Sequence, residues 1–229
     1  MRASRTMRLG IAIIAIAALG STLTTPALAK KPDRNEGQVR VVVSLAPMNF
    51  IPEGTENTDA DLAVATGNEG LVFTETFTGT EAEVEAAIAD WKQTALTEGV
   101  EPDLAPGTIG TMAKHTAFGD CGYSSVELRD WDYSTYNRVG YLKAEFSLNR
   151  SATTYVTDVL IFSSSIIDGW TAHVYRSGNL NGGTYWSTAG QVVVPKAQNY
   201  GATLVRAIVQ TSGGSCETSG PRVDGVWIN

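Results

Sequence analysis

Apolar residues alternate with polar ones in short runs through the second half of the chain. Within residues 139–148, for example, Leu142, Ala144 and Phe146 fall on one side of an extended strand. Similar runs, separated by turn-forming residues, occur at Tyr123–Arg129, Tyr155–Phe162, Trp170–Tyr175, Gln191–Val194, Leu204–Gln210 and Val223–Ile228. About seven short strands without intervening helices predict a mainly β chain, with an antiparallel β-sandwich (immunoglobulin-like or jelly-roll-like) over residues 111–229.

One segment has helical periodicity instead. Thr80 and Glu83 have the spacing of a capping box, and Gly99 followed by Pro102 marks the end of the helix. The apolar residues between these limits share one face: Val84, Ala87, Ile88, Trp91 and Ala95. The pattern predicts an amphipathic helix that packs on the body of the protein.

The segment 30–110, which contains this helix, is acidic. Residues 51–110 hold 13 Asp and Glu against one base, Lys92, whereas residues 111–229 hold nine residues of each sign. Two strands are also predicted here, at Gln38–Leu45 and Leu71–Phe77. We interpret the segment as an acidic surface region that precedes the sandwich domain, and a removable pro-segment is the alternative.

Residues 1–29 have the organisation of a signal peptide. Arg2, Arg5 and Arg8 precede an apolar run of 12 residues, and Ala27 and Ala29 are small residues suited to cleavage after Ala29. The apolar run is shorter than the roughly 20 residues that span a membrane. The sequence therefore predicts a secreted, extracellular chain without stable membrane insertion.

The net charge argues against two classes of binding partner. The whole chain carries −7, and without the three arginines of the signal peptide the mature chain carries −10. Nucleic acids and anionic membranes bind clustered Lys and Arg, so neither is an expected partner.

Cys121 and Cys216 are the only two cysteines. In an exported protein an even number of cysteines favours a disulfide. The sequence Gly119-Asp120-Cys121-Gly122 superficially resembles the nucleophile segment of chymotrypsin-like proteases. Those enzymes need a histidine well upstream, whereas His115 lies only six residues away. We therefore expect Cys121 to be structural.

Three short motifs are similar to those of small secreted bacterial β-proteins without an assigned function. They are Gly119–Gly122, Leu148-Asn149-Arg150 and the region of Cys216, and they cover the last half of the chain. The resemblance implies a β fold and a disulfide, and it implies no activity.

Motifs for metals and cofactors are missing from the sequence. His115 and His173 are the only histidines, and neither lies in a zinc-binding motif. Nothing matches a nucleotide-binding or hydrolase motif, so no catalytic residue, metal or cofactor is predicted.

Aromatic and acidic residues cluster between two predicted strands. Exposed aromatic rings on a β scaffold can stack on sugar rings, while nearby acids accept hydrogen bonds from hydroxyl groups. The candidate ligand-binding residues are Asp130, Trp131, Asp132, Tyr133 and Tyr136, together with Tyr185 and Trp186 after the glycine-rich loop. The alternative is that these aromatics cover the hydrophobic core.

These patterns favour a secreted, non-enzymatic binding module with a polysaccharide or cell-wall glycan as its ligand. Two alternatives remain at this point. One is a structural or regulatory protein with a removable pro-segment at 30–110, and the other is a hydrolase with an unrecognised site.

Overall fold

The structure is a computed structural model that describes residues 37–55, 71–100, 115–130, 138–164, 169–218 and 220–228. All of them belong to one compact unit, residues 31–229. The predicted signal peptide and four candidate site residues, Trp131, Asp132, Tyr133 and Tyr136, lie outside the described residues.

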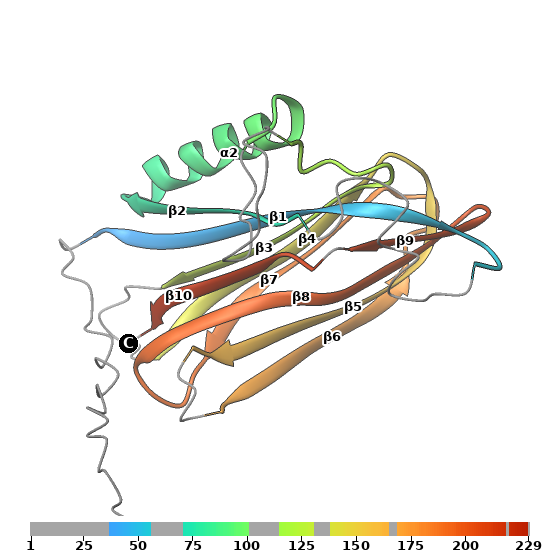
Figure 1. Ribbon diagram of the computed structural model, residues 1–229. Helices are drawn as coiled ribbons and strands as arrows, with labels where there is room; N and C mark the ends of the chain where they lie inside the picture. Colours follow the sequence, from blue (N-terminus) through green and yellow to red (C-terminus); the bar gives the residue numbers. More distant parts are fainter. Residues whose placement is uncertain are drawn as a thin grey trace, which may run out of the picture. The chain divides into compact units, whose positions relative to one another are not determined.

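The described chain is mainly β, as predicted, with one α-helix (Figure 1). The elements are β1 (Val39–Pro52), β2 (Phe73–Gly79), α2 (Glu81–Thr97), β3 (Gly122–Asp130), β4 (Val139–Leu148), β5 (Ala152–Ser163), β6 (Thr171–Asn179), β7 (Tyr185–Val193), β8 (Gln198–Thr211), β9 (Gly214–Thr218) and β10 (Arg222–Ile228).

The described strands form one antiparallel sheet in the order β6-β5-β8-β9-β1-β3-β4-β7. Strand β2 is added beside β1, and β10 beside β8. The sheet curls on itself, so that β3 and β10 pack against each other across its inside. The expected pair of separate sheets is therefore not confirmed. A single curled sheet encloses the core, because hydrogen bonds continue from one half into the other.

The curl comes from two strands that bend together. β4 continues into β5 through residues 149–151, and β6 continues into β7 through residues 180–184. The two chains stay paired through the bend: Leu148 N donates to Thr184 O at 2.8 Å, and Leu180 N donates to Thr153 O at 2.8 Å. Asn181 and Gly182, with φ of 51° and 87°, supply the left-handed conformation that the bend requires.

The strands β1 and β8 cross the middle of the sheet, and β9 joins them. β1 pairs with β3 along one edge, and along the other with β2 at its start and β9 at its end. The short strand β9 was missed in the sequence because its first residues, Gly214 and Ser215, resemble a turn. Since β1 lies inside the sheet, removal of residues 30–110 would separate β3 from β9.

The core fills the inside of the curl. β4 presents Leu142, Ala144 and Phe146 to it, as the alternation predicted, and Trp186 of β7 stacks on Phe146 with 5.4 Å between ring centroids. Cys121 and Cys216 are fully buried in the same core and are paired, as predicted, with their Cα atoms 5.9 Å apart.

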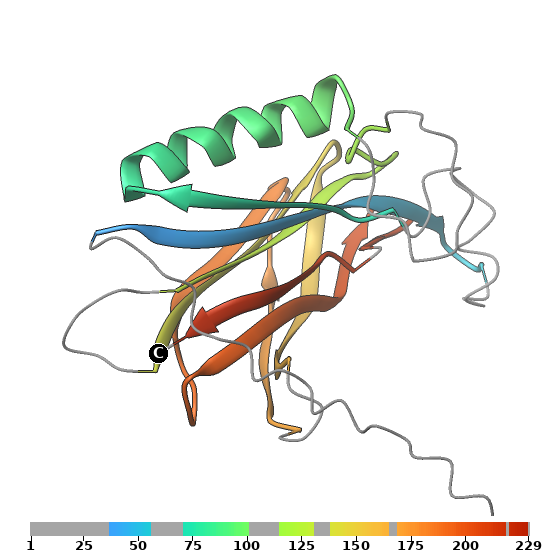
Figure 2. The same ribbon diagram turned by 60° about the vertical axis from the view of Figure 1, so that its left-hand side comes forward.

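Helix α2 covers the outer face of β1 and β2 (Figure 2). Its capping box is present, because Glu83 N donates to the Thr80 side chain and Thr80 N donates to Glu83 Oε2. Val84, Ile88 and Ala95 are buried as predicted, whereas Ala87 is exposed. No helix in the described part of the chain is long and apolar enough to cross a membrane.

The disulfide joins the two neighbours of β1, since Cys121 precedes β3 and Cys216 lies opposite Phe50. Replacing both cysteines with Ala should lower the free energy of unfolding by about 4 kcal/mol, because the unfolded chain loses a constraint over 95 residues. Urea unfolding of the oxidised protein and the variant measures the difference. An unchanged midpoint and slope would contradict the pairing.

Candidate functional site

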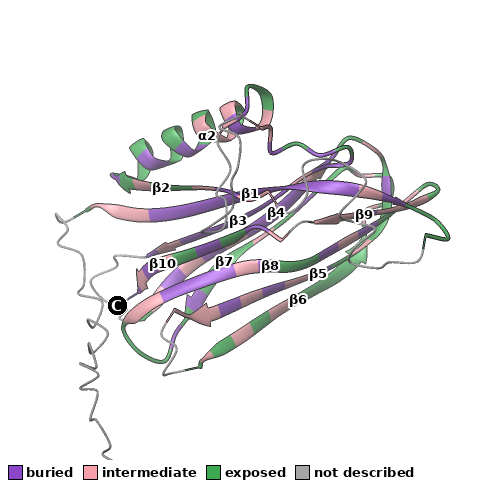
Figure 3. Cartoon of the chain, viewed as in Figure 1, coloured by how far each residue is buried: buried purple, intermediate pink, exposed green. Residues whose placement is uncertain are grey.

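The two halves of the sheet differ on their outer faces. Helix α2 lies over the half that contains β1 and β2. No described helix or strand packs on the outer face of β5, β6 and β8 in the other half, and the residues of β6 are exposed or intermediate (Figure 3). Within the described part of the chain, side chains on this second face are therefore exposed to solvent.

The covered half contains a buried acid between two lysines. Glu145 of β4 is only 4% exposed. Lys92 Nζ of α2 lies 2.7 Å from Oε1 of Glu145, and Lys143 Nζ lies 3.0 Å from its Oε2. Burial favours the neutral acid, but the two ammonium groups outweigh it, so the pKa of Glu145 is lowered. The contact with Lys92 holds the helix to the sheet, whereas Lys143 lies on the same strand as Glu145.

A second buried acid lies beside the first. Glu127 of β3 is 2% exposed, and Arg129 Nε donates to its Oε1 at 3.0 Å. Arg129 also reaches the helix, where its Nη2 lies 2.5 Å from Glu85 Oε1. Burial, together with the charge of Glu145, raises the pKa of the neighbouring Tyr123 to about 12, so this phenol stays neutral. The buried acids of this half are thus paired with cations of the sheet and the helix.

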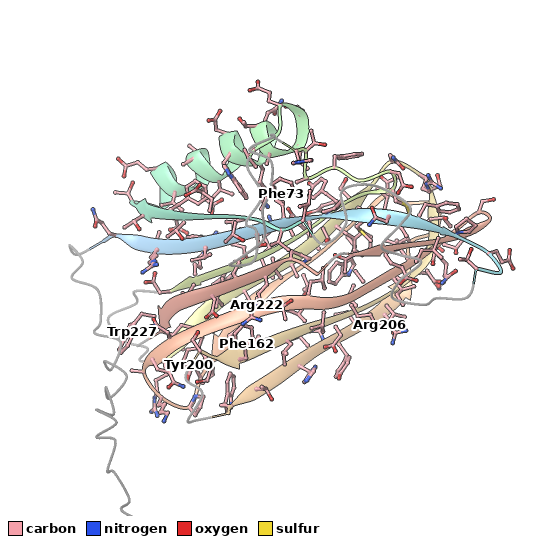
Figure 4. All side chains as sticks on the ribbon, in the orientation of Figure 1. Phe73, Phe162, Tyr200, Arg206, Arg222 and Trp227 are labelled. Carbon is pink, nitrogen blue, oxygen red and sulfur yellow. A yellow bond between two sulfur atoms is a disulfide. The ribbon has the colours of Figure 1, made fainter. Side chains whose placement is uncertain are left out.

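The uncovered half carries the candidate site, which we call the β8 face. It consists of outward side chains on four strands, β5, β6, β8 and β10. They are Val156, Asp158, Leu160, Phe162, His173, Tyr175, Arg206 and Arg222. Figure 4 shows Phe162, Arg206 and Arg222 along this side of the sheet. Between Gly201 and Gln210, β8 is about 30 Å long at the usual rise of a strand.

A histidine, a tyrosine and an acid meet at the middle of the β8 face. His173 Nδ1 lies 2.9 Å and 3.1 Å from the two carboxylate oxygens of Asp158 on the next strand. The rings of His173 and Tyr175 are parallel within 4°, with centroids 5.3 Å apart. Tyr175 is 63% exposed, so the stacked pair offers a ring to the solvent.

Phe162 and Arg222 form a second stack toward one end of the face. The Phe162 ring lies over Gly201, where any larger residue would collide with it. The guanidinium carbon of Arg222 lies 4.6 Å from the centroid of the same ring. Glycine is thus required on β8 so that the aromatic ring can lie flat on the sheet.

Arg206 is the exposed cation at the middle of β8. It lies opposite Asp158, beside a bulge at which Val205 is the extra residue. In the described part of the chain the Arg206 side chain makes no hydrogen bond or ion pair. Val205 itself is 47% exposed. The bulge thus places a cation and an apolar side chain together on the open face.

A hollow of about 410 Å³ lies at the other end of the face. The hydroxyl and amide side chains of Thr55, Thr153, Gln210 and Ser215 line it, together with Glu53. This volume is in the range of small-molecule sites, and the lining can both donate and accept hydrogen bonds. A ligand with many hydroxyl groups fits this chemistry.

The structure describes three of the sequence-predicted site residues, and their side chains do not form one site. Asp130 is 3% exposed and accepts a hydrogen bond from Arg40 N at 2.8 Å, so its carboxylate is structural. Trp186 is 9% exposed and lies in the core. Tyr185 is 50% exposed, but it points to the opposite face of β7 and donates to Glu145 Oε2 at 3.0 Å.

The β8 face was not recognised in the sequence, because its residues come from four strands that are far apart along the chain. The spacing of His173 and Tyr175 was the only local signal. Only the register of β5 with β6 brings Asp158 to the histidine. Among the described residues, no group of three or more His, Cys, Asp or Glu could hold a metal ion.

Comparisons with protein-family models, curated proteins and solved structures find no match to this chain.

Substitution of Glu145 with Gln should lower the free energy of unfolding at pH 7 by about 3 kcal/mol, because two partly buried ammonium groups lose their partner. The ionised carboxylate stabilises the fold above the carboxyl's unfolded pKa of about 4.3, and this contribution is lost as the pH falls through the lower folded-state pKa. The difference between wild type and variant should therefore shrink as the pH falls from about 5 to about 3.

Urea unfolding at several pH values measures this difference. Glu85→Gln is the matched control, because Glu85 is 54% exposed and its ion pair with Arg129 should contribute under about 1 kcal/mol. A Glu145→Gln effect of the same size at both ends of the pH range would show that the buried lysines do not stabilise the carboxylate.

Proposed function

We propose that the mature chain is a secreted, non-enzymatic binding module that takes an extracellular polysaccharide along the β8 face. The observation that carries the proposal is the row of exposed aromatic and arginine side chains on a sheet face that no described element covers.

The chemistry of the face suits a chain of sugar rings. The exposed ring of Tyr175 can stack on the apolar face of a sugar, and Arg206 can donate hydrogen bonds to hydroxyl or carboxylate oxygens. The hollow at the end of the face adds hydroxyl and amide groups. A length of about 30 Å favours a polymer over a single sugar.

The core beneath the face supports this role. Val159, Ile161, Leu204 and Ala207 are buried directly under it, so the strands that carry the binding groups are held in place. A rigid, preformed surface loses less conformational entropy when it binds than a flexible one does. The predicted loop residues Trp131, Asp132, Tyr133 and Tyr136 lie outside the described residues, and their contribution stays a prediction.

Replacement of Tyr175 or Arg206 with Ala should lower retention on the preferred insoluble polysaccharide about tenfold, which corresponds to about 1.4 kcal/mol per contact. The measurement is depletion of the mature chain from solution over a panel of insoluble glycans. Tyr185→Ala is the matched control, because it removes an exposed tyrosine from the other half of the sheet.

A Trp131→Ala variant reports separately on the predicted loop. Loss of retention in this variant alone would move the ligand away from the β8 face. Failure of the wild-type chain to bind any member of the panel would refute the proposal as a whole.

A further inference from the structure

The strand β6 forms an edge of the sheet. In the described part of the chain it pairs with β5 alone, and all of its nine residues are exposed or half-exposed. It contains no proline, lysine or acid, which are the residues that commonly protect such edges. An edge of this kind can accept another strand.

The register shows which backbone groups of β6 point away from the sheet. Ser163 N donates to Trp170 O and Leu180 N donates to Thr153 O, both in the register of the β5–β6 pairs. In an antiparallel ladder every second residue pair exchanges hydrogen bonds, so the even-numbered residues of β6 bond to β5. The N–H and C=O groups that point outward belong to Thr171, His173, Tyr175, Ser177 and Asn179.

We propose that two copies of this chain associate through their β6 strands, about a two-fold axis at Tyr175. In this register the outward-facing residues meet only one another: Tyr175 lies opposite its own copy, His173 opposite Ser177, and Thr171 opposite Asn179. Every outward amide then finds a carbonyl, which gives about ten hydrogen bonds between the two chains.

The side chains agree with this register. The two Tyr175 rings, each 63% exposed, become a cross-strand pair on the outer face. Arg176, the one residue of β6 with a permanent charge, lies opposite Val174 rather than its own copy. Arg176 Nη1 donates to Tyr175 O at 2.9 Å, and this carbonyl keeps a second lone pair for the partner's amide.

The other edge of the described sheet, β7, also contains no proline, lysine or acid, but it has no aromatic residue at its centre. A two-fold axis at its centre would bring Ala189 opposite its own copy and would form no aromatic pair there. Association through β6 also has a consequence for the β8 face. It joins two such faces into one continuous surface, on which a polymeric ligand could contact both copies.

The test measures the molar mass of the full mature chain by sedimentation from about 1 to 500 µM, without any ligand. Wild type should pass from monomer to dimer. Ser177→Pro should weaken association about tenfold or more, because proline removes an outward N–H and leaves the hydrogen bonds to β5 intact. Ser177→Ala is the matched control and should change association less than about twofold, because only the backbone amide pairs.

Hydrogen exchange of the wild-type protein shows which strand forms the interface. It does not require that any variant folds. The amides of His173, Tyr175 and Ser177 should exchange more slowly as the protein concentration rises. A monomer at all concentrations, equal association of the Pro and Ala variants, or concentration-dependent protection on β7 instead would overturn the proposal.

Discussion

The remaining structure depends on one corner of the sheet. At this corner β4 continues into β5 and, beside it, β6 continues into β7. Two paired strands turn together there, so their hydrogen bonds continue from one half of the sheet to the other. Asn181 and Gly182 permit the turn because their backbones are left-handed. The bend lets the inner faces of both halves share one hydrophobic core, without a second sheet.

The two outer faces that this bend creates differ in what covers them. On one half, α2 covers the apolar side chains of β1, and the buried acids Glu127 and Glu145 are balanced by cations from both the sheet and the helix. A buried carboxylate without such partners would be costly, so these pairs fix where the helix lies. On the other half, the charged and aromatic side chains of the β8 face remain open to solvent.

Local patterns predicted local structure well. The alternation in 139–148, the capping box at Thr80 and the pairing of Cys121 with Cys216 are each confirmed, since neighbouring residues determine the first two and two cysteines allow a single pairing. The register between distant strands has no comparable local pattern in the sequence. β9 resembled a turn and Trp186 resembled a loop aromatic, while the contact of His173 with Asp158 exists only because β5 pairs with β6.

The exposed β8 face and the β6 edge belong to the same half of the sheet. β6 and β7 are successive parts of one bent strand, and no described strand lies beyond either of them. Helix α2 protects the half around β1, and the core protects the inside of the curl. Among the described residues, the outer side of β5, β6 and β8 is the exposed surface on which flat aromatic groups lie next to backbone amides without a partner strand. A ligand along β8 and a second chain along β6 would use adjacent surfaces, and neither would require the core to rearrange.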